Sequence, residues 1–311
     1  MAESKSSEVA EEEESLADAL AVLNKNPHVH RSCDALVPRK PQRIVSLVPS
    51  LSESLEVLGL GERLVGVTEY CVHPAGAFDA LPKLGGTKDA DVDAIIAVRP
   101  DLVIANQEEN TARAVRKLAE AEIDVWVTYP RTVSEGAELL SDLARLGATE
   151  AAIAAHVAPC LAAVAAAEQA NADATRPRPR VFCPIWRDPW MTIGRDTYIH
   201  DMIELCGGEN LYADPPVVAG EGAIQGRANR RYPIVDLDRV IEDEPDIILL
   251  PDEPYRFDEW DARRLGRTEC PAARDGRVHL IDGTLVSWYG PRIAEAIQAL
   301  ATIIAAPSAS S

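Results

Sequence analysis

Positive charge is scarce in this chain. Its 311 residues include 31 Lys and Arg against 50 Asp and Glu, which gives a formal net charge of −19. Nucleic acids and anionic membrane surfaces are bound through basic footprints. The charge balance therefore argues against both as partners.

Three further features are missing. The six cysteines include no CxxC pair, so neither a disulfide framework nor a zinc site is indicated. No run reaches the ~18 apolar residues that a membrane helix needs. The stretch before Pro27 is acidic at its start and lacks the apolar core of an export signal. As written, the chain is expected in the cytoplasm; a true start upstream of Met1 would restore export to the periplasm or cell exterior.

Aromatic residues are also few, at 5% of the chain, so the positions of the five tryptophans are informative. Trp186 and Trp190 flank Asp-Pro in "PIWRDPWM", which is too polar and too rich in proline for a core strand. This stretch follows the strand-like "RVF". We expect both rings on a loop at the end of a strand.

What the sequence does contain is an alternation of helices and apolar strands. From Arg43 onward, "RIVSLVPS" is typical of a strand, and "SLSESLEVLGLG" is typical of a helix with a serine cap and a glycine stop. Further pairs of this kind follow. The pattern predicts an α/β fold with mostly parallel sheets.

The pattern also occurs twice. "VDAIIAVRPDLVIA" and "LDRVIEDEPDIILLP" share an order of apolar-Asp, helix, Pro-Asp and strand, and Asp93 and Asp238 are separated by 145 residues, as are the two Pro-Asp pairs. Duplicated segments of this kind predict two similar lobes. Because open parallel sheets bind ligands at the carboxyl ends of their strands, we expect a ligand cleft between the lobes.

An alanine-rich stretch with high helix propensity separates the lobes. Pro159 within it is expected to kink or split the helix. The predicted organisation is an acidic flexible extension with one short helix at Ser15–Leu23, a lobe, one long backbone helix, a second lobe and a disordered tail. The respective boundaries are 1–42, 43–147, 148–176, 177–306 and 307–311.

Several stretches carry a family resemblance over about residues 43–305. In order they are "SLVPSLSESLEVLG", "VTEYCVHP", "RPDLVIANQEEN", "ELCGGENLYAD" and "WYGPRIAEA". Together they resemble the helical-backbone (class III) substrate-binding proteins of ABC importers, above all the vitamin B12-binding members. The resemblance implies a non-catalytic, monomeric protein that binds a corrinoid or related metal chelate. The cobalt or iron belongs to the ligand, no cofactor is required, and an ABC permease is the partner if the chain is exported.

Ligand residues carry over from the family in part. The cleft tyrosine falls on Tyr70, and an aromatic before a proline falls on Tyr232. Two family tryptophans fall on Thr87 and Asn106, so a different corrinoid, haem or a ferric siderophore stays open as the ligand. Further candidates on predicted strand-end loops are Asn106, Gln107, Trp186, Trp190, Trp288, Tyr289 and Arg292. Core packing is the alternative for each aromatic, and an ion pair with a local acid such as Glu295 is the alternative for Arg292.

Histidines offer two metal signals. His73, on the Tyr70 loop, is the candidate axial ligand of a bound cobalt or iron, because neutral imidazole binds both. His28 and His30 form a weak His-x-His pattern. A class II chelatase, which inserts metal into tetrapyrroles, is the enzymatic alternative, with His73 and Glu108 or Glu109 as base and metal ligand.

The duplicated acids have a family counterpart as well. Members present one glutamate per lobe to arginines of the permease, and the matching positions here are Asp93 and Asp238. The alternative is a structural role, since an aspartate ahead of a helix caps free N–H groups.

Overall fold

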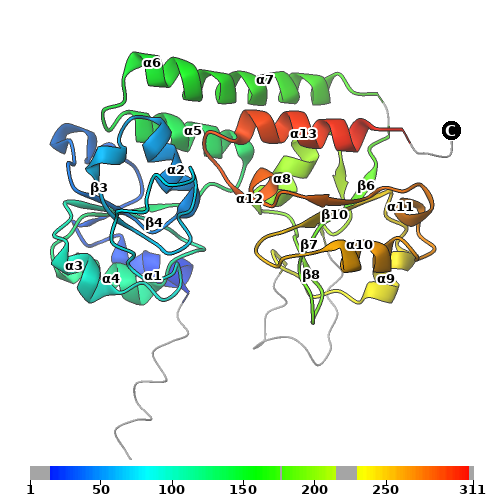
Figure 1. The fold of residues 1–311 in the computed structure, drawn as a ribbon, viewed down its shortest axis with the longest axis horizontal. Helices are drawn as coiled ribbons and strands as arrows, with labels where there is room; N and C mark the ends of the chain where they lie inside the picture. Colours follow the sequence, from blue (N-terminus) through cyan, green and yellow to red (C-terminus); the bar gives the residue numbers. More distant parts are fainter. Residues whose placement is uncertain (1–14, 176, 215–229, 308–311) are drawn as a thin grey trace, which may run out of the picture. The chain divides into compact units, whose positions relative to one another are not determined.

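The computed structural model describes residues 15–175, 177–214 and 230–307. The chain divides into two compact units, each of which combines helices with a sheet (Figure 1). Unit 1 comprises Met1–Tyr129 with Glu138–Ala158, and unit 2 comprises Pro130–Ala137 with Pro159–Ser311. The predicted α/β class is confirmed. The ligand cleft expected between the lobes stays a prediction.

Unit 1 is built on a parallel sheet with the strand order β1-β5-β4-β2-β3. Its strands are β1 (Val29–His30), β2 (Ile44–Ser46), β3 (Leu64–Val67), β4 (Leu102–Asn106) and β5 (Val125–Thr128). Every residue of the central strand β4 is buried. A strand covered on both faces needs such a continuous apolar run.

Helices cover both faces of this sheet. They are α1 (Leu16–Leu23), α2 (Pro49–Val57), α3 (Val92–Ala97), α4 (Ala112–Glu120) and the 3-10 turns η1 (Val37–Arg39) and η2 (Gly61–Arg63). Figure 1 shows α1, α3 and α4 on one side and α2 on the other. Alternate strand residues such as Val45, Val103 and Val125 join the core beneath α1, α3 and α4.

The N-terminal segment differs from its prediction. Ser15 caps α1 by accepting the N–H of Asp18, and Leu16, Leu20 and Leu23 pack into the core of unit 1. Strand β1 then pairs with β5 at the edge of the sheet. The short helix at Ser15–Leu23 is confirmed, but the flexible extension is wrong for residues 15–42, which belong to the folded unit. Residues 1–14, and all of the expected 307–311 tail except Pro307, lie outside the described residues.

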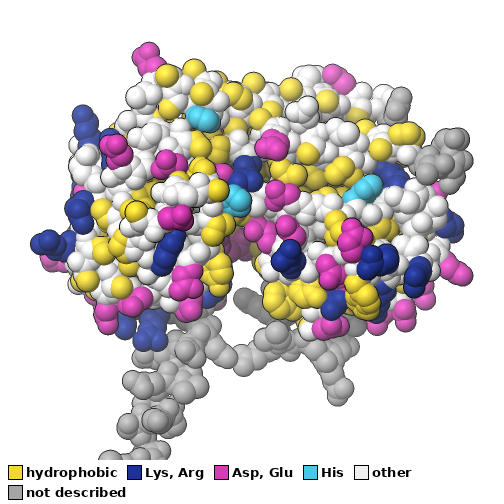
Figure 2. Space-filling view, viewed as in Figure 1, with side chains coloured by type: hydrophobic (Ala, Val, Ile, Leu, Met, Phe, Trp, Pro, Cys, Tyr) yellow, Lys and Arg dark blue, Asp and Glu magenta, His cyan; other side chains and the backbone are white. Residues whose placement is uncertain are grey.

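The backbone helix runs without a break through α6 (Glu150–Ala152), a π-helical turn at Ile153–Val157 and α7 (Ala158–Ala172). Pro159 does not split it, because the wide π turn just before the proline absorbs the missing N–H and the ring. An 18-residue window of this helix has a mean hydropathy of 1.6. Contrary to the sequence expectation, its length and composition alone would allow a membrane span, which is weak evidence for one. Figure 2 shows apolar side chains along it.

Unit 2 repeats the sheet of unit 1 without the added edge strand. Its strand order is β11-β10-β6-β9, and all its strands are again parallel. Between β6 and β9 the chain forms a separate short antiparallel pair, β7-β8. The strands are β6 (Arg180–Phe182), β7 (Pro184–Trp186), β8 (Met191–Thr192), β9 (Glu209–Asn210), β10 (Ile247–Pro251) and β11 (Val278–Ile281). The helices are α5 (Val133–Ala144), which enters unit 1, α8 (Tyr198–Leu205), α9 (Leu237–Glu242), α10 (Glu259–Leu265), α11 (Pro271–Arg274), α12 (Thr284–Ser287) and α13 (Ile293–Ala305).

The two Pro-Asp pairs have the same structural role. The carboxylate of Asp101 accepts the N–H of Arg43 at 3.0 Å, and that of Asp246 accepts the N–H of Arg180 at 2.8 Å. Each aspartate thus fixes the start of the neighbouring strand in its own unit. The internal duplication inferred from the sequence therefore extends to hydrogen bonds.

Candidate functional site

The carboxyl ends of parallel strands form the edge at which such sheets bind ligands. In unit 1, four residues form what we call the first-unit edge: Arg31 after β1, Tyr70 and Lys88 after β3, and Gln107 after β4. Arg31 Nη2 donates to Gln107 Oε1 at 3.1 Å. Lys88 Nζ donates to the carbonyl of Glu108. This edge is polar and carries two cations.

Tyr70 is the exposed aromatic side chain of the first-unit edge. It is 60% exposed, and a Cβ added at Gly86 would lie 3.1 Å from its Cε2 atom. The ring therefore lies against backbone that only glycine leaves uncovered. The predicted ligand residue Tyr70 is accessible to a ligand.

Asn106 has a different role from the predicted one. Its side chain is 3% exposed and its Oδ1 accepts the N–H groups of Glu108 and Glu109 at 2.7 and 3.2 Å. Its own N–H donates to Asn110 Oδ1, and Asn110 Nδ2 donates to the carbonyl of Thr87 at 2.9 Å. Asn106 shapes the loop after β4, and its buried amide is not placed to meet a ligand. Gln107, beside it, is half-buried at the edge.

Both cations of the first-unit edge are partly desolvated. Burial lowers the pKa of Arg31, an effect that the nearby Tyr129 partly offsets. Burial also lowers the pKa of Lys88, against which Glu109 and Glu108 act. Lys88 thus has acidic neighbours that compensate its charge.

His73 lies half-buried on the loop that carries Tyr70. Over the described residues, no group of three or more His, Cys, Asp or Glu side chains is arranged to hold a metal ion. A chelated metal needs only one axial ligand from the protein, so His73 stays a prediction. The weak His28 and His30 signal has another explanation, because both rings bond to Asp124.

In unit 2, an aromatic and cationic cluster lies at the end of β7 and in the segment after β10. We call Trp186, Arg187, Tyr255 and Trp260 the second-unit edge. Trp186, 45% exposed, meets Tyr255 edge to face with ring centroids 5.6 Å apart. The guanidinium carbon of Arg187 lies 5.4 Å from the Tyr255 ring centroid and 5.0 Å from that of Trp260. Arg187 is held there by an ion pair with the buried Asp261.

Three other predicted ligand aromatics lie in the core of unit 2. Trp190 is 8% exposed and stacks on Phe257 at 5.8 Å. Trp288 and Tyr289 are buried too, and Tyr289 meets Tyr198 edge to face. For these three rings the packing alternative describes the structure.

Tyr232 and Arg292 are intermediate cases. The half-buried Tyr232 ring lies 5.4 Å from the guanidinium carbon of Arg231. Arg292 Nη1 donates to Thr284 Oγ1 at 3.0 Å and lies 4.0 Å from Asp282. The guanidinium also lies over the Trp288 ring. The acid that pairs with Arg292 at this distance is Asp282, in keeping with the alternative of a local ion pair.

The duplicated acids are not helix caps. The cap of α3 is Asp91, whose side chain accepts the N–H of Ala94, and the cap of α9 is Asp236. Asp93 and Asp238 each stand two residues further on, in the first helical turn, and both are exposed. The capping alternative is therefore wrong for both, and each carboxylate faces solvent.

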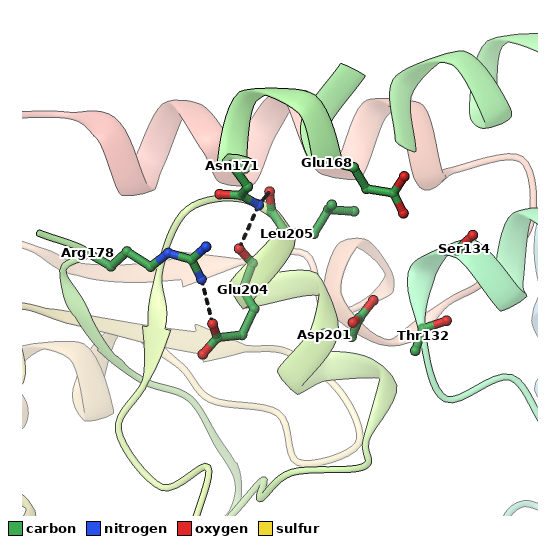
Figure 3. Close-up of a pocket in the computed structure, with 8 residues that line it drawn as sticks. All are labelled: Thr132, Ser134, Glu168, Asn171, Arg178, Asp201, Glu204 and Leu205. Atoms are coloured by element: carbon green, nitrogen blue, oxygen red, sulfur yellow. Dashed lines mark hydrogen bonds and ion pairs between the residues drawn. The ribbon is translucent and has the colours of Figure 1, made fainter. Parts of the chain in front are cut away.

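A pocket of about 380 Å³ lies within unit 2, between α7, α8 and the start of α5 (Figure 3). Its lining is acidic, with Glu168, Asp201 and Glu204. Arg178 pairs with Glu204 at 2.6 Å, and Asp201 accepts the N–H of Val133 at 2.7 Å. Burial raises the pKa of Asp201, although the bond from Val133 opposes this. None of the described residues that line the pocket is aromatic, so the pocket does not suit a flat chelate.

The structure adds residues that the sequence reasoning missed. Arg31 and Lys88 join the first-unit edge, and Arg187, Tyr255 and Trp260 join the second. The stretch "PYRFDEW", which begins shortly after β10, was the available signal, since Tyr255 and Trp260 follow the end of that apolar strand in the sequence. Arg31 had no signal, because its segment was taken for an extension.

Each unit is an α/β domain with a parallel sheet and displays side chains at the carboxyl edge of that sheet. Two such units are the architecture of a bilobal binding protein. A family model described as periplasmic binding protein matches residues 44–283. The chain belongs to the periplasmic binding protein family, as the sequence resemblance predicted. The match begins after α1 and β1, so the N-terminal segment precedes it.

Three relatives match most of this chain in sequence. The ABC transporter substrate-binding lipoprotein YvrC of Bacillus subtilis is 28% identical over 280 residues, which is 87% of this chain and 82% of the relative. The vitamin B12-binding protein of Vibrio cholerae is 24% identical over 275 residues, 86% of this chain and 90% of the relative. The cobalamin-binding protein of Halobacterium salinarum is 27% identical over 269 residues, 84% and 69% respectively.

Solved structures share the fold. The periplasmic vitamin B12 binding protein BtuF of Vibrio cholerae superimposes with a TM-score of 0.70 at 22% identity, covering 85% of this chain and 97% of that one. The periplasmic haem-binding protein RhuT from Roseiflexus sp. RS-1, in apo form, gives 0.69 at 24% identity with the same coverage. At these identities the likeness concerns the fold.

Proposed function

We propose that this chain is a non-catalytic substrate-binding protein for a tetrapyrrole-type metal chelate, either a corrinoid or haem. The observation that carries the proposal is the exposed Trp186 ring supported by Tyr255 at the second-unit edge. A flat, largely apolar macrocycle is bound through aromatic faces with a few polar groups at the rim. Relatives named for vitamin B12 and cobalamin binding support the corrinoid class.

Haem is the second candidate, and a specific observation favours it. The family tryptophans of the B12 site fall on Thr87 and Asn106, and here Asn106 is buried while the Thr87 carbonyl accepts a bond from Asn110. Neither position offers an aromatic wall. His73 would supply an axial ligand to iron as well as to cobalt. A ferric siderophore is the third ligand class, and in every case the metal arrives with the ligand.

We further propose an extracytoplasmic location and an ABC permease as partner. Relatives and structural neighbours named as lipoproteins or periplasmic proteins support the location, and nothing supports the cytoplasmic expectation. The solvent-facing Asp93 and Asp238, at matching positions of the two units, would meet cationic groups of the permease. The chain would act as a monomer.

Titration separates these ligands. The purified chain is mixed with aquocobalamin, dicyanocobinamide, haemin and a ferric hydroxamate siderophore, and visible spectra and calorimetry report binding. We expect micromolar or tighter binding of one tetrapyrrole class without turnover. Insertion of Fe²⁺ into free protoporphyrin would instead establish the chelatase alternative, with His73 and Glu108 or Glu109 as its residues. Binding of the siderophore alone would overturn the tetrapyrrole assignment.

A further inference from the structure

The N-terminal segment places one cation at the carboxyl edge of unit 1. Strand β1 is in parallel register with β5, with His30 opposite Trp126, so Arg31 follows where β1 ends. From there its guanidinium reaches Gln107, the residue that follows β4. Because all these strands are parallel, Arg31 stands at the ligand-binding edge of the sheet.

The segment that carries Arg31 is held in place. The N–H of Val125 donates to the carbonyl of His28 at 2.7 Å, and the rings of His28 and His30 lie 3.1 and 3.0 Å from the Asp124 carboxylate. Helix α1 packs into the same core. Arg31 is therefore prearranged on a folded element, which lowers the entropy lost when it meets a partner.

Arg31 differs from Lys88, the second cation of this edge, in whether neighbouring carboxylates balance its positive charge. Lys88 has Glu108 and Glu109 beside it. Within the described ranges, Arg31 is exposed and has no carboxylate partner, its one side-chain bond going to the neutral Gln107. A guanidinium has five N–H donors in a planar fork, which matches the oxygens of a carboxylate or phosphate.

The charge of the whole chain gives this arrangement its significance. A net charge of −19 disfavours the approach of an anionic ligand unless a local cation offsets it. Arg31 provides such a charge on the edge that also displays Tyr70. A neutral amide rim would need no guanidinium there.

We propose that Arg31 recognises an anionic oxygen group, a carboxylate or a phosphodiester, on the chelate that this protein binds. The proposal rests on the proposed function and adds a residue from outside the segment that matches the family. Haem offers propionate carboxylates, and cobalamin offers the phosphodiester of its nucleotide loop. The protein would thereby distinguish acid-bearing chelates from neutral or esterified ones.

Matched ligand pairs test this with one variant and one control. Arg31→Gln removes the charge at the carboxyl edge, and Arg99→Gln removes the same charge at the opposite edge, just before β4. Each is titrated with haemin and haemin dimethyl ester, and with cobalamin and cobinamide, which lacks the phosphodiester. We expect Arg31→Gln to weaken the acid-bearing member of the bound pair by about tenfold or more and the other member by less than about twofold.

The salt dependence gives a second measurement. The affinity of the unmodified chain for the acid-bearing ligand should fall with added NaCl, and Arg31→Gln should flatten that dependence, while Arg99→Gln leaves both unchanged. An Arg31→Gln variant that binds all ligands like the unmodified chain, or that weakens both members of a pair equally, overturns the role of Arg31 alone. Failure of the unmodified chain to bind any tetrapyrrole overturns the proposed function itself, and Arg31 with it.

Discussion

The Nε2 atom of His30 lies 3.0 Å from Oδ1 of Asp124, a residue 94 positions further along the chain. His28 Nδ1 lies 3.1 Å from the same oxygen, and Arg39 pairs with the other. One carboxylate at the start of β5 thus gathers three basic side chains of the N-terminal segment. This network holds β1 at the edge of the sheet.

Removal of the carboxylate should loosen the segment. Asp124 is 8% exposed, so Asp124→Asn removes from a buried position the carboxylate that His28, His30 and Arg39 share. We expect a loss of roughly 1–3 kcal/mol in the free energy of unfolding, measured by urea denaturation followed by circular dichroism. Asp34→Asn, which breaks an exposed pair with Arg145 in the same unit, should leave the midpoint nearly unchanged. Equal effects of the two substitutions would contradict the network.

The same carboxylate predicts a dependence on pH. Burial alone would raise the pKa of Asp124, but the bonds from His30 and His28 and the charge of Arg39 lower it below its ordinary value of 3.8. A carboxyl whose pKa is lower in the folded state contributes stability above its unfolded pKa and loses it as the pH falls through the folded pKa.

The difference in stability between the unmodified chain and Asp124→Asn should therefore be constant at neutral pH and shrink below about pH 4. Urea titrations of both proteins at a series of pH values measure it. A difference that persists undiminished at acid pH would show that the carboxylate charge is not its source.

Much of the fold follows from local pattern and from repetition. The Pro-Asp pairs at one constant offset predicted the duplication, and in the structure Asp101 and Asp246 each accept an N–H at the start of a neighbouring strand. The short helix of the N-terminal segment was predicted, but the place of the segment in the folded unit was not. Its place depends on His30 meeting Asp124 across a long sequence separation, which no periodicity reveals.

The types of side chain at the candidate site were predictable from the sequence, but the role of each residue was not. Trp186 ends β7 and Trp190 lies just before β8, four positions further on, whereas sequence reasoning put both on one loop with the same role. Only tertiary packing distinguishes them, because the stacking of Trp190 on Phe257 depends on the path of the loop after β10. Asn106 was misjudged for a related reason, since its amide satisfies backbone groups of its own loop.

Substitution of Trp186 should therefore affect ligand binding, whereas substitution of Trp190 should affect stability. Trp186→Ala removes an exposed ring, so it should weaken ligand binding by about tenfold while the unfolding midpoint changes little. Trp190→Ala empties a core position and should cost about 3–5 kcal/mol of stability. Calorimetric titration and urea denaturation of both variants measure the two effects. A binding loss confined to Trp190→Ala would reverse the assignment.

Two aspartates at the start of α3 allow a role in permease docking to be tested separately from a role in folding. Asp91 caps the helix and Asp93, two residues on, faces solvent. Asp91→Ala should cost about 1 kcal/mol of stability. Asp93→Ala should leave stability and ligand affinity unchanged. If the proposed docking role holds, it should reduce ligand uptake by cells in which the variant replaces the native protein, because one charge offered to the permease is lost.

Asp238→Ala should act in the same way from the other unit, and the double variant should reduce uptake further than either single change. Accumulation of the labelled chelate by whole cells measures this, with the amount of each variant checked by immunoblot. Normal uptake by the double variant would remove both residues from any contact with a permease. A loss matched by Asp91→Ala at equal protein level would show instead that helix stability, rather than the exposed charge, controls transport.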